Sequence, residues 1–120
     1  MARYVDGYVL VVPKKNLAAY RRMAKAACKV WLDHGALQYC ESAGEDLKVK
    51  FGVPFTRLLK LKAGETAVFS WVVYKSRKQR DAVNTKVMKD PRLAAMMKGK
   101  KMPFDMKRMV YGGFELMVDA

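Results

Sequence analysis

The sequence predicts an α+β fold, a single antiparallel sheet with helices packed on one face, and three observations lead to it. Thr66 to Tyr74 (TAVFSWVVY) has no charge, Gly or Pro, as expected of a strand buried on both faces. Other apolar segments of strand length alternate with segments of helical periodicity. The 120 residues, 52% of them hydrophobic, suffice for one domain over residues 1–120 with a core of its own.

The N-terminal part of the chain predicts a strand followed by a long helix. Tyr4 to Val12 (YVDGYVLVV) is rich in Val and Tyr, and Gly7 inside it predicts a bulge or a close backbone contact. From Lys14 to Asp33 apolar residues recur every three or four positions with Arg and Lys between them, which indicates an amphipathic helix. Gly35 is a typical C-terminal stop for that helix.

The middle of the chain predicts an edge strand and an irregular segment before the central strand. Ala36 to Glu41 (ALQYCE) is short and alternates, as edge strands do. Residues 42–60 show no sustained period, and Arg57 to Lys62 is predicted as a short extended piece. Gly64 then predicts the turn into Thr66 to Tyr74.

Two helices and a last strand are predicted after the central strand. Ser76 and Gln79 have the spacing of a capping box, and Asp90 followed by Pro91 repeats a helix start signal. The terminal segment RMVYGGFELMV is an apolar strand in which the double glycine predicts a kink or bulge. The helices are expected over Arg77 to Lys89 and Pro91 to Met97, and the strand over Arg108 to Val118.

The predicted order of strand, helix, two strands, helix and strand is that of the ferredoxin-like βαββαβ fold. Right-handed crossovers place the first strand beside Thr66 to Tyr74 and put both main helices on one face of the sheet. Three of the four strands are apolar on both sides, so a monomer would expose a large apolar patch on the other face. We therefore expect a second copy to cover that face in an isologous homodimer.

The net charge of the chain indicates which kinds of partner it attracts. The chain has 24 Lys and Arg against 11 Asp and Glu, a formal charge of +13 that attracts phosphate backbones and acidic ligands. The basic residues are spread over predicted helix surfaces and loops and are not clustered with stacking aromatic groups. We therefore expect solvated surfaces, with a basic nucleic-acid-binding module as the alternative.

Several classes of location and partner are disfavoured. No segment reaches the roughly 18 apolar residues of a membrane span, and residues 1–30 lack the hydrophobic region of a signal peptide. Cys28 and Cys40 have no CxxC spacing and are interpreted as buried free thiols in a reducing compartment. We expect a cytoplasmic protein without a membrane partner.

The sequence also lacks the motifs of the common cofactor sites. It contains no phosphate-binding loop, nucleophile elbow or dinucleotide fingerprint, and we expect neither a cofactor nor a metal. A single histidine, His34, excludes a histidine-rich metal site. We interpret His34 as a residue that interacts with the negative end of the first helix, or alternatively as a catalytic partner of Cys40.

The candidate site consists of polar residues inside apolar strands, because a buried charge has to be compensated or used. Asp6 in the first strand and Glu115 in the last are the two most conspicuous, and their strands are predicted to be neighbours. The candidates for catalysis are Asp6, Tyr74, Glu115 and His34, and those for ligand binding are Tyr8, Ser70 and Tyr111.

Side-chain alternation groups the strand residues of this set in pairs, each on one face of its own strand. The pairs are Asp6 with Tyr8, Ser70 with Tyr74, and Tyr111 with Glu115. The sequence leaves open whether the three pairs share one face of the sheet. If they do, two carboxylates and three phenols line a pocket suited to gripping or deprotonating an aromatic or enolic small molecule. Alternatively, both carboxylates lie near strand ends or pair with Arg108, Lys75 or a partner chain.

Five segments together resemble the YbaA-like bacterial proteins, a family of unknown function: VDGYVLVVP, AYRRMA, HGAL, FSWVVYKSRKQRDAVNTKVMKDPR and MPFDMKRMVYGGFE. Met106 departs from the Gly of that pattern, and Asp46 to Arg57 lacks its Pro-Gly-rich loop. The resemblance implies the dimeric α+β barrel shared with antibiotic-biosynthesis monooxygenases. By analogy of fold alone it suggests a cofactor-independent oxygenase or isomerase, and a structural or stress-related protein without a ligand is a further alternative.

Overall fold

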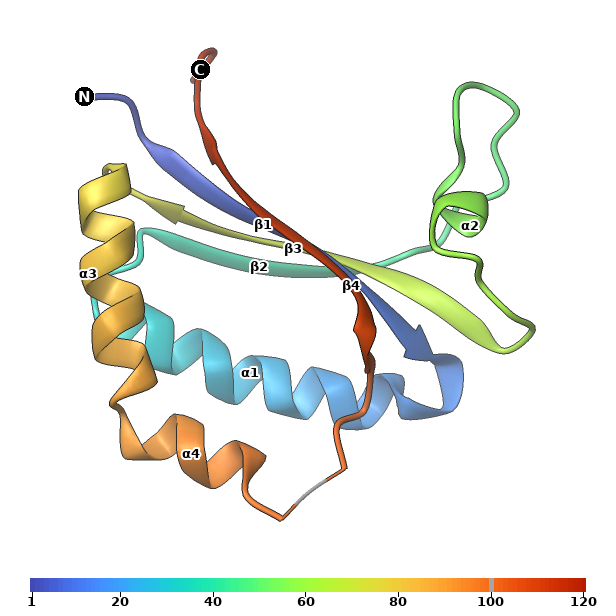
Figure 1. The fold of residues 1–120 in the computed structure, drawn as a ribbon, viewed down its shortest axis with the longest axis horizontal. Coiled ribbons are helices and arrows are strands. Elements are labelled where there is room, and N and C mark those ends of the chain that lie inside the picture. Colours follow the sequence, from blue (N-terminus) through green and yellow to red (C-terminus); the bar gives the residue numbers. More distant parts are fainter. Residues whose placement is uncertain (100) are drawn as a thin grey trace.

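Figure 1 shows the computed structural model of the chain, which describes residues 1–99 and 101–120. None of the helices described is both long and apolar enough to cross a membrane. The elements are β1 (Tyr4–Pro13), a 3₁₀ turn η1 (Lys14–Asn16), α1 (Leu17–Asp33), β2 (Gln38–Ala43), α2 (Phe55–Leu58), β3 (Glu65–Tyr74), α3 (Arg77–Met88), α4 (Pro91–Met97) and β4 (Asp105–Glu115).

The four strands form one antiparallel sheet in the order β2-β3-β1-β4. This order confirms the ferredoxin-like prediction, with β3 in the interior and β2 at an edge. Pairing of β1 with β3 is continuous from Tyr4 opposite Tyr74 to Pro13 opposite Glu65. Helices α1, α3 and α4 lie together on one side of the sheet (Figure 1), which leaves the other side to the short α2 and its loops.

The predicted helix signals are confirmed. The Ser76 hydroxyl accepts a hydrogen bond from the backbone N–H of Gln79 at 3.1 Å and caps α3. The Asp90 carboxylate accepts from the backbone N–H of Arg92 at 2.8 Å, directly before the proline that begins α4. Gly35 follows α1 with φ of +112°, a left-handed conformation that glycine adopts at little cost.

Strand pairing continues through Gly7, Gly112 and Gly113, so the bulge considered at these positions is absent. The β1 register is continuous through Gly7, and the one irregularity against β4 lies between Val9 and Val11. A side chain at Gly113 would collide with the ring of Tyr4, whose Cε2 would lie 2.7 Å from the added Cβ. Gly113 therefore makes room for the ring of Tyr4, a close approach of the kind that a glycine within a strand allows.

Three other segments differ from the prediction. The expected extended piece over Arg57 to Lys62 is wrong, because α2 ends there and Lys60 takes a positive φ of 51°. This turn brings Leu59 and Leu61 together onto Val11 and Ala67.

The last strand begins and ends earlier than the expected Arg108 to Val118. It starts at Asp105, opposite Val11, and ends at Glu115, opposite Tyr4. Because β1 itself begins at Tyr4, the chain has no strand to pair with beyond that point. The edge strand β2 is likewise shifted, from the predicted Ala36 to Glu41 to Gln38–Ala43.

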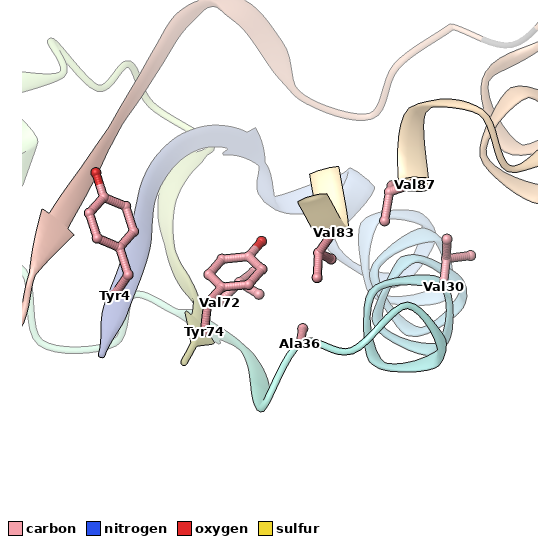
Figure 2. Close-up of a cluster of buried hydrophobic side chains, with 7 residues drawn as sticks. All are labelled: Tyr4, Val30, Ala36, Val72, Tyr74, Val83 and Val87. Carbon is pink, nitrogen blue, oxygen red and sulfur yellow. The ribbon is translucent and has the colours of Figure 1, made fainter. Parts of the chain in front are cut away.

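The core lies mainly between the sheet and the helices. Figure 2 shows one cluster, in which Val72 and Tyr74 of β3 point towards Val83 and Val87 of α3 and Val30 of α1. A second cluster joins β1 and β3 to the first half of α1 through Leu10, Val12, Tyr20, Ala24 and Val68. Both clusters lie on the helix-covered face and hold the walls of the site described below.

The opposite face of the sheet carries large exposed apolar side chains. Residues paired in register share a face, and this face includes Phe69, Val110 and Phe114, which are 48%, 49% and 60% exposed. The segment after β2 covers only one end of it, through Leu47 and the two leucines that follow α2. An apolar surface of this kind is what the sequence pattern predicted for the uncovered side.

Candidate functional site

The sheet register brings the predicted strand residues to one face. Tyr8 is paired with Tyr111 on β4 and with Ser70 on β3, and Ser70 is paired in turn with Glu41 on β2. These four residues form one row across all four strands on the side of the helices. Because side chains alternate along a strand, Asp6 and Tyr74 lie on the same face as this row. The three residue pairs, whose common face the sequence left open, therefore share one face of the sheet.

Asp6 is completely buried and forms an ion pair that the sequence analysis missed. Its Oδ1 lies 2.8 Å from Nη1 of Arg80, which also donates to the hydroxyl of Tyr111 at 3.0 Å. The guanidinium carbon lies 4.9 Å from the centre of the Tyr4 ring. The other carboxylate oxygen, Oδ2, has no hydrogen-bond partner within the described part of the chain. Burial raises the pKa of Asp6, and the charge of Arg80 opposes that rise.

Tyr74 belongs to a hydrogen-bonded group beside this ion pair. Its hydroxyl donates to Oδ1 of Asn84 at 3.2 Å, and the indole N–H of Trp31 donates to the same oxygen at 3.3 Å. Burial raises the pKa of Tyr74, and the negative charge of Asp6 adds to the effect. Tyr74 therefore stays a protonated donor and is a poor general base.

Tyr8 and Ser70 line a cavity of about 190 Å³ between the sheet and helices α1 and α4. The Tyr8 ring stacks on Tyr111 with centroids 4.8 Å apart, so the Arg80 contact to Tyr111 indirectly supports this wall. The lining is mainly aromatic and sulfur-containing: Tyr8, Tyr20, Trp31, Tyr39, Phe104, Met23, Met96, Met97, Met102 and Met109, with Ser70 and Glu41 as polar members.

Glu41 occupies the end of the row at the cavity wall. Its Oε1 accepts a hydrogen bond from the hydroxyl of Tyr20 at 2.6 Å, and its Oε2 accepts one from Tyr39 at 2.7 Å. Tyr20 comes from α1, and Tyr39 is two residues before Glu41 on the same face of β2. Burial raises the pKa of both phenols, and Glu41 adds to the rise.

A second hollow of about 350 Å³ lies between α1 and the edge strand β2. Tyr20, Ala24, Tyr39 and Glu41 line both this hollow and the inner cavity, so the two hollows adjoin at Glu41. The outer hollow is also lined by Arg21 and Lys25 of α1 and by Cys28 and Ser42.

Glu115 and His34 are not brought into the cavity. Glu115 shares the helix-side face but lies at the end of β4 and is exposed. His34 is the C-terminal cap of α1, and its Nε2 lies 2.8 Å from Oδ2 of Asp90. Arg92 donates to Asp90 and to Asp33, so these residues tie α1 to the start of α4. The proposed pair of His34 with Cys40 is wrong, because Cys40 is paired with Trp71 on the opposite face of the sheet.

The alternative partners considered for Asp6 also differ from those observed. Arg108 binds Glu65 at 2.6 Å and Asp105 at 2.8 Å, away from Asp6. Within residues 1–99 and 101–120 no group of three or more His, Cys, Asp or Glu side chains is placed to hold a metal ion.

Two residues of the site, Arg80 and Glu41, are not among the candidates predicted from the sequence. For each of them a pattern in the sequence indicates the position. Arg80 is spaced three and seven residues before Val83 and Val87, which places a cation on the apolar face of α3. A cation there indicates an acidic partner in the sheet. Glu41 alternates with Tyr39 in β2, which places a carboxylate and a phenol on one face.

Comparisons with known proteins agree with the resemblance inferred from the sequence. Residues 3–106 match the family described as "Protein of unknown function (DUF1428)". The uncharacterised protein YbaA of Escherichia coli K12 is 43% identical over 117 residues, which cover 98% of each chain, and YbaA of Shigella flexneri is equally similar.

Two solved structures share the fold. A dimeric ferredoxin-like protein from an uncultured marine organism superposes with a TM-score of 0.63, at 9% identity and over the whole of both chains. A NIPSNAP family protein of unknown function from Agrobacterium tumefaciens has a TM-score of 0.61 at 10% identity, covering 96% of this chain and 88% of its own. The family match spans most of the chain, so the chain belongs to the DUF1428 family, and YbaA is a relative over nearly its whole length.

Proposed function

We propose that the protein binds a small aromatic or enolic molecule in the cavity between the sheet and helices α1 and α4. The observation that carries the proposal is the cavity itself, a hollow of about 190 Å³ walled by aromatic rings and methionines. Small-molecule sites are typically concave and mostly apolar, with a few polar groups that fix the orientation of the ligand. Ser70 and Glu41 supply such groups on one wall.

The volume limits the ligand to about one ring. An apolar protein cavity of about 150 Å³ is large enough to hold benzene. The cavity here, at about 190 Å³, therefore has room for a single aromatic ring with one or two small substituents. Methionine side chains are flexible and polarisable, so a lining with five of them adapts to related rings.

The predicted site residues take two roles in this proposal. Tyr8 and Ser70 line the cavity and contact the ligand. Asp6 does not line the cavity and acts through its ion pair with Arg80. Arg80 also donates a hydrogen bond to Tyr111, and the Tyr8 ring of the cavity wall stacks on Tyr111. Asp6 is thus a positioning residue for the aromatic wall.

Filling the cavity tests the proposal. Ala27 of α1 lines the cavity, whereas Ala18 is exposed on the same helix, so Ala27→Leu and Ala18→Leu are a matched pair. At a phenol concentration of 100 times Kd, binding stabilises the native state by about 2.7 kcal/mol, which corresponds to a rise in Tm of about 10 °C. We expect this shift in the wild type and in Ala18→Leu, and its loss in Ala27→Leu. Equal shifts in all three proteins, or none in the wild type with any monocyclic ring, would contradict the proposal.

We also propose that two copies associate through the face of the sheet opposite the helices. The exposed side chains of Phe69, Val110 and Phe114 support this proposal, since a monomer would leave them in water. A structural neighbour of the same fold is dimeric, which is consistent with it. Because the cavity lies on the other face, association and ligand binding are separable.

A charge placed on that face tests the association. Phe114→Lys is expected to give a monomer in size-exclusion chromatography with light scattering, since a buried lysine without a partner is costly. Met88→Lys, at an exposed methionine of α3, is the matched control and should remain dimeric. A monomeric wild type at micromolar concentration would end this proposal and leave the ligand proposal intact.

A further inference from the structure

Glu41 is the one acidic residue in the described part of the chain that is half-buried and forms no ion pair. The protein has 24 Lys and Arg for 11 Asp and Glu, yet within the described ranges Glu41 forms no ion pair. Its half-buried carboxylate is held by two neutral hydroxyls, those of Tyr20 and Tyr39. Arg21 and Lys25 line the neighbouring hollow without pairing with it. The carboxylate is therefore oriented but its charge is not neutralised by a neighbouring cation.

The two tyrosines leave Glu41 able to accept further hydrogen bonds. A carboxylate offers about four lone-pair positions, and each oxygen of Glu41 uses one of its two for a tyrosine. Burial raises the pKa of both phenols, so they stay protonated and act as donors. The remaining acceptor positions belong to a side chain that lines both hollows.

Ser70 lies beside Glu41 on the cavity wall. The two residues are register partners on β3 and β2, and paired side chains on one face have Cβ atoms about 5 Å apart. Glu41 accepts hydrogen bonds, whereas the Ser70 hydroxyl can donate one. This places an acceptor and a donor next to each other in an otherwise apolar cavity, a pattern that matches a molecule with a hydroxyl beside a carbonyl.

We propose that Glu41 is the hydrogen-bond and proton acceptor of the site, and that the ligands are single-ring molecules with a phenolic, enolic or enolisable group. This inference rests on the proposed binding of a small molecule in the cavity. With an enolisable ligand, a Glu41 oxygen takes a proton from the carbon next to the carbonyl. The electron pair of that C–H bond forms the C=C bond, and the carbonyl π pair moves to oxygen, which accepts a hydrogen bond from Ser70. Return of the proton from Glu41 to that oxygen gives the enol, so no oxidant or reductant is consumed.

Phenol and toluene, which have similar shapes and differ in one donor, test the binding step. Hydrogen bonds to charged groups are strong enough that we expect the wild type to bind phenol at least about tenfold more tightly than toluene in calorimetric titrations. Glu41→Gln should bind toluene unchanged and lose this preference. Glu41→Asp, which keeps the charge but shortens the side chain, is the second variant, and Glu45→Gln at an exposed position is the control.

Proton exchange tests the acceptor role directly. Phenylacetone in D₂O should exchange the protons next to its carbonyl faster with the wild type and with Glu45→Gln than with Glu41→Gln, by about a hundredfold or more, as is typical of a positioned general base. Each variant is first checked for a native thermal transition, and Glu41→Asp is used if Glu41→Gln does not fold.

The outcomes distinguish a failure of the assigned role of Glu41 from a failure of the proposed ligand binding in the cavity. If neither ring binds the wild type, both fail. If both rings bind but the phenol preference survives in Glu41→Gln and in Glu41→Asp, the cavity is a ligand site and the role of Glu41 is wrong. Binding that depends on Glu41 without accelerated exchange would refute the proton-transfer step and leave Glu41 as a recognition residue.

Discussion

Removing Arg80 is expected to destabilise the protein strongly, because it would leave a buried carboxylate without its counter-ion. Asp6 is fully buried, its Oδ2 has no hydrogen-bond partner among the residues described, and Oδ1 depends on Arg80 at 2.8 Å. Breaking a buried pair by deleting one partner costs about 3–5 kcal/mol. The Arg80 side chain is 13% exposed, so water can reach the site and the lower value applies. For Arg80→Ala we expect a loss of about 3 kcal/mol in the free energy of unfolding, or about 12 °C in Tm.

The pH dependence of this loss has a definite sign. Burial raises the pKa of Asp6 in the folded protein above its ordinary value of 3.8, and removing Arg80 raises it further. A raised folded pKa means that the folded state binds more protons, so stability falls as pH rises from about 4 through the folded pKa. The penalty of Arg80→Ala should therefore be smallest in acid and should grow towards neutral pH.

Urea denaturation at several pH values measures the free energy of unfolding of the wild type and of Arg80→Ala. Two further variants serve as controls. Arg77→Ala removes an exposed arginine from the same helix, 3.7 Å from Asp81, and should cost less than about 1 kcal/mol. Adding Asp6→Asn to Arg80→Ala removes the unpaired charge and should recover part of the loss at neutral pH. A loss below about 1 kcal/mol for Arg80→Ala, or a penalty that shrinks as pH rises, would refute the assigned role of this pair.

Three further predictions follow from other parts of the structure. Gly113→Ala should lose about 1–3 kcal/mol in denaturant titrations because its Cβ would collide with Tyr4, whereas Gly112→Ala, 3.7 Å from the nearest atom, should be much milder. Arg92 holds the pKa of Asp90 well below its usual range, so Asp90 stabilises the fold at neutral pH and loses this effect as pH falls below about 4. The Tm difference between wild type and Asp90→Asn should therefore narrow in acid, and a constant difference would contradict it. The charge of +13 should give binding to mixed-sequence DNA that vanishes between 50 and 200 mM salt in fluorescence anisotropy, whereas tight binding at physiological salt would favour a nucleic-acid function.

Much of the fold could be predicted because its signals are local. The uncharged run from Thr66 to Tyr74 identified the interior strand β3, and the capping residues Ser76 and Asp90 marked the two later helix starts. The boundaries that moved are those set by a partner strand: β4 ends at Glu115 because β1 begins opposite it. Strand ends depend on what is available to pair with, and that information is distant in the sequence.

The candidate site was only half visible in the sequence for the same reason. Side-chain alternation has a period of two and correctly paired Asp6 with Tyr8 on one face of β1. It could not say which face of β3 or β4 would join them. Arg80 reaches Asp6 across 74 positions, and no local pattern specifies that contact.

The sequence by itself determined the order of the elements, the interior position of β3, the helix starts and the family, since each of these depends on short-range periodicity, capping chemistry or sequence identity. The tertiary structure alone decided the row from Tyr111 through Tyr8 and Ser70 to Glu41, and the cavity above it. The register between strands and the packing of α1 on the sheet are set by the burial of apolar surface over the whole chain. A cavity exists only where those long-range contacts leave a space, so no single segment can encode it.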